Sequence, residues 1–138
     1  MRSWFLLAVA TVIFSAGCNG TAYHKAVVAE HDFKSAVKAF EDAEVGEFEA
    51  GNVSIEDHTA IQKGVVDVAN AGQQLTVLLQ ENASRQTVAQ QLSNVDSLLQ
   101  NLLSSGVAHV KNDKTRGDLE LALQAIQDII TNAEVQLQ

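Results

Sequence analysis

The feature that most constrains the fold is the spacing of apolar residues, which recur alternately three and four positions apart in four segments. This period places them on one side of an α-helix, whereas a half-buried strand needs alternation at every second residue. Flanking apolar residues (Val37, Ala69, Leu98, Leu103, Ala122 and Ile129) widen each stripe into the face that a globular bundle buries. The four stripes are Ala22, Ala26, Ala29, Phe33, Ala36, Phe40, Ala43; Ile61, Val65, Val68, Gly72, Leu75, Leu79; Val88, Leu92, Val95, Leu99, Leu102; and Leu119, Leu123, Ile126, Ile130, Ala133, Leu137.

Composition agrees with an all-α chain. The 138 residues contain no proline, which helix interiors tolerate poorly and loops and strand edges use freely. Hydrophobic residues make up 46% and aromatic residues only 5%, so the core is predicted to be aliphatic. The length suits one domain.

Short polar segments separate the stripes. Residues 51–54 divide the first two, residues 82–84 the next two, and residues 105–113 the last two. Ser54 followed by Asp57 resembles a capping box, and Asn112 is predicted to be an N-cap. Because short links join antiparallel neighbours, we expect an up-down-up-down four-helix bundle. In such a bundle, the N-terminus and the C-terminus of the domain lie at the same end. The alternative is a three-helix fold whose first helix stands apart as a stalk.

The N-terminal segment has the pattern of an export signal. Arg2 supplies a positive charge, and the apolar run from Trp4 to Phe14 is shorter than the roughly 20 residues that a membrane-spanning helix needs. Ser15-Ala16-Gly17-Cys18 follows. This stretch resembles the lipobox of bacterial lipoproteins: Ala16, Gly17 and Cys18 match, and Ser15 replaces the usual Leu.

The resemblance covers the first 18 residues and implies cleavage before Cys18 with a diacylglycerol thioether on that cysteine. Several acyl chains anchor a protein stably to a membrane. Together with the apolar stripes, the resemblance divides the chain into a signal peptide (1–17), a lipidated tether (18–22) and a bundle domain (23–138). In such lipoproteins, an Asp directly after the lipidated cysteine retains the protein at the inner membrane. This chain has Asn19 at that position. We therefore expect the cell envelope, and the outer membrane facing the periplasm in a two-membrane organism. An ordinary secretory leader with a coincidental cysteine is the competing interpretation.

The formal net charge of −8 disfavours contact with nucleic acid. Seven acidic residues follow one another without an intervening Lys or Arg. Those at the C-terminal end of the first predicted helix oppose its dipole. We therefore expect an acidic tip at the end away from the membrane, which either binds a basic partner or is solvated. Its residues are Glu41, Asp42, Glu44, Glu47, Glu49, Glu56 and Asp57.

Four histidines are candidate metal ligands. His24 and His31 are predicted to face outward, seven residues apart, with no further ligands beside them. His58 falls on the inward side of the second predicted helix, and His109 lies in a link at the same end. The chain has no Cys-x-x-Cys-His or His-Glu-x-x-His motif. We predict no cofactor and no metal. His58 and His109 are the candidates should a metal bind, and a partly buried His58 with a local hydrogen bond is the expected role.

The segment from Asn70 to Val110 carries only Glu81, Arg85 and Asp96 as fixed charges, and its outward positions are Gln, Asn, Ser and Thr. Such a surface loses less on desolvation than a charged one, so it suits a second copy or a protein partner. With no nucleophile, phosphate-loop or catalytic motif, we expect a non-enzymatic, membrane-anchored partner-binding or structural module. The alternatives are a small-ligand or metal-binding bundle and, without motif support, a hydrolase or transferase.

Overall fold

The computed structural model describes residues 22–137, and it describes side chains from Ala29 onward. Four helices account for most of this range: α2 (Ala22–Glu49), α3 (Ile55–Gln80), α4 (Arg85–Ser105) and α5 (Asp113–Leu137). A 3-10 turn, η1 (Val107–His109), lies between the last two. No strand occurs among these residues, and the prediction of an all-α, four-helix chain is confirmed. The predicted signal peptide, Cys18 and all but the last residue of the tether lie outside the described residues.

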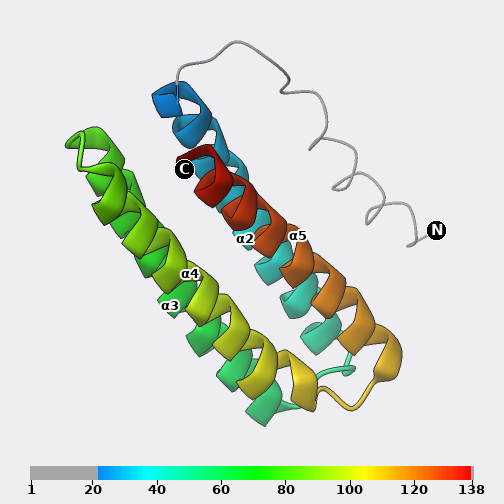
Figure 1. The fold of residues 1–138 in the computed structure, drawn as a ribbon. Coiled ribbons are helices and arrows are strands. Elements are labelled where there is room, and N and C mark those ends of the chain that lie inside the picture. The colour runs from blue at the N-terminus through cyan, green and yellow to red at the C-terminus, as the bar shows by residue number, and fades with distance from the viewer. Residues whose placement is uncertain (1–21, 138) are drawn as a thin grey trace.

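The helices pack as a ring in which each contacts two others. α3 packs against α2 and α4, and α5 packs against the same two helices. Figure 1 shows the beginning of α2, the end of α5 and the turn between α3 and α4 at one end of the bundle. The α2–α3 link (residues 50–54) and the α4–α5 link (residues 106–112) lie at the other end, which we call the link end. Among the described helices, none is long and apolar enough to cross a membrane.

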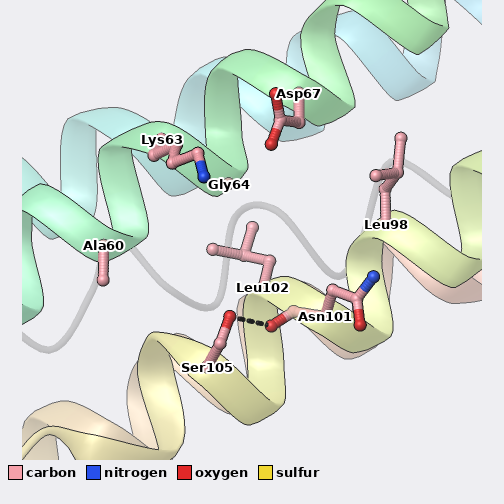
Figure 2. A pocket seen from close by; sticks show the side chains of 8 residues that line it. All are labelled: Ala60, Lys63, Gly64, Asp67, Leu98, Asn101, Leu102 and Ser105. Carbon is pink, nitrogen blue, oxygen red and sulfur yellow. Dashed lines mark hydrogen bonds between the residues drawn. The ribbon is translucent and has the colours of Figure 1, made fainter.

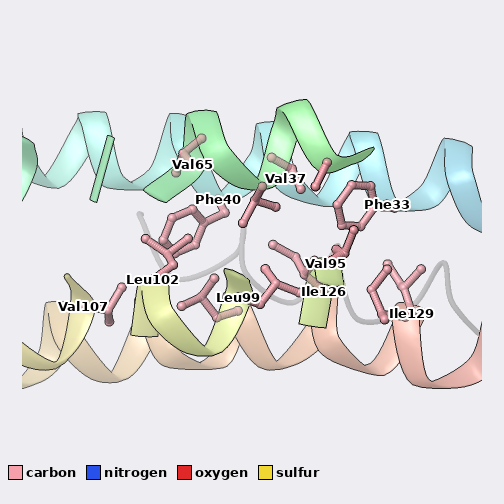
Figure 3. Packing of buried hydrophobic residues seen from close by; sticks show 14 of the residues in the cluster. Phe33, Val37, Phe40, Val65, Val95, Leu99, Leu102, Val107, Ile126 and Ile129 are labelled. Carbon is pink, nitrogen blue, oxygen red and sulfur yellow. The ribbon is translucent and has the colours of Figure 1, made fainter. Parts of the chain in front are cut away.

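The core follows the predicted stripes closely in three helices. Every predicted stripe residue of α3 and α4 is buried, as are the first four of α5. In α2, Phe33 and Phe40 supply the aromatic rings, and Figure 3 shows both pointing into the interior that α4 and α5 also line. Burial of apolar surface contributes about 25 cal/mol per Å² to folding. The mainly aliphatic core is therefore the largest stabilising contribution to the bundle.

The structure corrects one predicted stripe residue of α2 and one predicted flanking residue of α3. Glu44, not Ala43, continues the buried face of α2 and has no exposed surface. On α3, Ala69 is exposed and Ala71 is buried. The reason for the second correction is the position of α4, whose Gln91 Nε2 donates a hydrogen bond to the Ala71 carbonyl 2.8 Å away.

The helix ends are capped by the polar residues of the links. Ser54 Oγ accepts a hydrogen bond from the Asp57 amide and Asn112 Oδ1 accepts one from the Thr115 amide, so both predicted N-caps are confirmed. Ser84 caps α4 through the Thr87 amide in the same way. Gly51, with φ of 78°, follows α2 in the left-handed region, where glycine carries no steric penalty.

Candidate functional site at the link end

A buried carboxylate joins α2 to α3 close to the link end. Glu44 Oε1 lies 2.9 Å from Nδ1 of His58, and Gln62 Nε2 donates a hydrogen bond to Glu44 Oε2 over 2.6 Å. Since a carboxylate only accepts, the Nδ1 of His58 carries the hydrogen. His58 and Gln62 lie one helical turn apart on α3, so both donors reach the same carboxylate. We call these three residues the Glu44 cluster.

Phe48 covers the imidazole of this cluster. Its ring stacks on that of His58 with centroids 3.9 Å apart and planes inclined by 8°. The His58 side chain retains 23% exposure, whereas the Glu44 side chain retains none. The carboxylate is therefore buried beneath groups that hydrogen bond to it, while the imidazole of His58 remains partly exposed.

A second carboxylate ties the two links together. Glu47 Oε2 accepts hydrogen bonds from Asn52 Nδ2 at 2.6 Å and from Thr115 Oγ1 at 2.8 Å. Asn112 Nδ2 donates to Asn52 Oδ1 across 3.3 Å. The α2–α3 link and the start of α5 are thereby held by one polar network, which gives the link end a defined shape.

The predicted acidic tip is consequently divided. Glu44 is not on the surface, because it lies on the same side of α2 as Phe33 and Phe40, and Glu47 turns inward to the links. Asp57 accepts a hydrogen bond from the Ser54 hydroxyl. Glu49 and Glu56 are exposed and flank the α2–α3 link. The carboxylates available to a partner at this end are thus fewer than the seven in the sequence.

Lysine neutralises another part of the run. Lys38 Nζ lies 2.9 Å from Asp42 Oδ1 one turn along α2. The hydrogen bond from Lys38 to Asp42, reinforced by the charges of Asp42 and Glu41, raises the pKa of Lys38. Glu41 is partly buried beside this pair.

The structure does not bring the histidines together into a ligand set. His109 is exposed in η1, His58 is bound to Glu44, and His31 is exposed beside Asp32. Within residues 22–137, no three His, Cys, Asp or Glu side chains gather closely enough to hold a metal ion. His24 lies among the residues whose side chains are not described.

Sequence reasoning did not identify Gln62, Thr115 or Phe48 as members of these networks. The available signal was periodicity: Glu44 is four residues after Phe40 and seven after Val37, so it continues the buried stripe. A carboxylate in that register requires donors on a facing helix. The inward position predicted for His58 supplies one, and Gln62 one turn later supplies another.

A separate shallow pocket of about 230 Å³ lies between α3 and α4. Figure 2 shows Leu102 pointing from α4 towards Gly64 of α3, with Lys63 and Asp67 on the α3 side. A β-carbon on Gly64 would approach Leu102 Cδ1 to 2.7 Å, so glycine allows the two helices to come this close. Ala60, Leu98, Asn101 and Ser105 complete the lining.

The polar groups at the link end are fully paired. Its two inward carboxylates are each held by two side-chain donors, and every buried side-chain nitrogen or oxygen in the described range has a hydrogen-bond partner. Comparison with known proteins gave no match to this chain among family models, curated proteins or solved structures.

Proposed function

We propose that this chain is an envelope lipoprotein, anchored by lipid on Cys18, that binds a partner through its link end without catalysing a reaction. The observation that carries the proposal is the position of the link end, which lies opposite the beginning of α2. A lipid on Cys18, just before α2, would hold the beginning of that helix near the membrane and present the link end away from it. An anchor of this kind raises the effective concentration of the protein for partners in the same compartment.

The networks around Glu44 and Glu47 support binding at this end. They hold the last turns of α2, the α2–α3 link and the start of α5 in one arrangement. A preorganised surface loses less conformational entropy on binding than a flexible loop does. Glu49 and Glu56 are exposed beside these networks, and we propose that they meet basic groups of the partner.

The anchor is tested by replacing Cys18 with Ser in the full chain. We expect the protein to leave the membrane fraction and to lose metabolic labelling by a palmitate analogue. Retention in the membrane fraction with unchanged labelling would contradict lipidation on Cys18.

The binding surface is tested by photo-crosslinking in the native cell from positions next to the α2–α3 link. We expect Glu49→Lys and Glu56→Lys to reduce capture of a defined partner because both reverse an exposed charge at the link end. Glu81→Lys is the matched control, since Glu81 is exposed in the α3–α4 turn at the opposite end. Equal capture by all three variants would contradict a partner at the link end.

A further inference from the structure

The outer face shared by α3 and α4 differs in charge from the rest of the bundle. α2 carries seven acidic and three basic residues, and α5 carries five acidic and two basic residues. α4 carries only Arg85 and Asp96, and after the first turn of α3 that helix carries only Lys63 and Asp67 besides His58. A chain of net charge −8 repels its own copies through most of its surface. The α3–α4 face is where that repulsion is weakest.

Lys63 and Asp67 are the charged pair on this face, and they do not neutralise each other. Both are exposed on the α3 side of the 230 Å³ pocket (Figure 2). Three other lysine–carboxylate pairs four residues apart form salt bridges in the described helices: Lys34–Glu30, Lys38–Asp42 and Lys114–Asp118. No such bridge joins Lys63 to Asp67 in the same part of the chain, so both charges are open to an external partner.

We propose that a second copy of this chain docks on the α3–α4 face in a two-fold symmetric dimer. In such a dimer, residue i of one copy meets residue j of the other, and j meets i. Lys63 of each copy then faces Asp67 of its partner, so the dimer forms two ion pairs, to which each copy contributes one lysine and one aspartate. The partly buried side chain of Leu98 and the small side chain of Ala60 line the same pocket, and we expect them to supply apolar contacts beside the ion pairs.

The size of the face is sufficient for a specific dimer. The 21 residues of α4 extend about 31 Å at 1.5 Å per residue, and two packed helices are about 19 Å wide. The face therefore offers roughly 600 Å² per copy, or about 1,200 Å² in total, which reaches the lower limit of specific interfaces. The exposed residues of α3 and α4 include several neutral amides, among them Asn70, Gln74, Gln90, Asn94 and Asn101.

The proposal is tested by charge reversal in the full chain, purified in detergent, with sedimentation velocity as the measurement. We expect the unchanged chain to be dimeric. Lys63→Glu places two acidic residues at each contact and Asp67→Lys places two basic residues there. Each variant should therefore dimerise about tenfold more weakly. Circular dichroism of each variant confirms that the bundle remains folded.

Mixing the two variants gives the decisive result. In the mixed dimer, Glu at position 63 faces Lys at position 67, and Lys63 faces Asp67, so both contacts become attractive. We expect the mixture to form heterodimers about as tightly as the unchanged chain dimerises, whereas each variant alone dimerises about tenfold more weakly. Lys114→Glu and Asp118→Lys, at the same spacing on α5, are the matched controls and should leave the dimer unchanged. A monomeric unchanged chain, or a dimer insensitive to positions 63 and 67, would overturn the proposal, and the outcome is independent of what binds at the link end.

Discussion

Glu44 and His58 lie fourteen residues apart in the chain, yet Nδ1 of His58 is 2.9 Å from Oε1 of Glu44. The pair bridges the last part of α2 and the first turn of α3, on either side of the α2–α3 link. Its carboxylate belongs to the buried face of α2, where the residues before it are Phe33, Val37 and Phe40. The bundle thus ends in a polar layer that closes the apolar core at the link end.

We predict that Glu44→Ala lowers the free energy of unfolding by about 2 kcal/mol or more. The substitution removes an acceptor from His58 and Gln62 and leaves a void among buried residues. Urea unfolding followed by circular dichroism measures the change. Glu49→Ala, an exposed residue of the same helix, is the control and should change stability by less than about 0.5 kcal/mol. Equal effects of the two substitutions would show that the Glu44 cluster is not structural.

Periodicity predicted the helices because α3 and α4 bury one continuous apolar stripe each. Ile61, Val65, Leu92 and Leu99 are large aliphatic residues in a three–four spacing, and a pattern of this kind has few other interpretations. The link residues also predicted where α3 and α5 begin. Ser54 and Asn112 accept hydrogen bonds from backbone amides in the first turns of these helices, which have no partner within the helix. The fold class was therefore available from local chemistry alone.

The polar layer was harder to predict because it depends on which helices face each other. A run of acidic residues looks like a solvated surface until a facing helix supplies donors, and Gln62 and Thr115 lie on two different helices. The correct register of α2 required choosing Glu44 over Ala43, against the preference for apolar residues in a core. Pairing information of this kind is not contained in the spacing within one helix.

The contact between Glu30 and α3 predicts a dependence of stability on pH. Burial opposes ionisation of Glu30, but hydrogen bonds from Lys34 and Thr76, together with the charges of Lys34 and His31, outweigh it and lower the pKa of Glu30 below 4.5. A carboxyl group whose pKa is lower in the folded state stabilises the fold above its unfolded pKa and loses that contribution as pH falls through the folded value.

We therefore expect Glu30→Gln to be less stable than the unchanged chain at pH 7 and to approach its stability as the pH falls through the lowered pKa of Glu30. Thr76→Val should reduce the same pH dependence, because the Thr76 hydroxyl donates to Glu30 Oε1 at 2.6 Å. Urea unfolding at several pH values measures both. A difference between Glu30→Gln and the unchanged chain that stays constant from pH 7 to pH 3 would contradict the lowered pKa.

Gly72 and Gly46 offer opposite predictions for the same substitution. A β-carbon on Gly72 would collide with Cε1 of Phe33, whose ring is buried, whereas one on Gly46 would have nothing within 4 Å. We expect Gly72→Ala to lower the unfolding free energy by about 1–3 kcal/mol through overpacking. Gly46→Ala should raise it by about 0.5–1 kcal/mol, because alanine favours the helix. Thermal unfolding of both variants measures the difference, and a gain in stability for both would mean that α2 and α3 do not approach closely at Phe33.

The network around Glu47 predicts that two distant residues are energetically coupled. Thr115 Oγ1 donates to Glu47 Oε2 over 2.8 Å although the residues are 68 positions apart. Thr115→Val should lower the unfolding free energy by about 1 kcal/mol, since it removes one donor while keeping the shape of the side chain. In a Glu47→Gln background the same change should cost less, because a neutral acceptor bonds more weakly than a charged one. A double-mutant cycle measured by urea unfolding gives the coupling energy, with Thr131→Val, an exposed substitution elsewhere on α5, as the control. Purely additive effects of the Glu47 and Thr115 substitutions would show that the two links are held by other contacts.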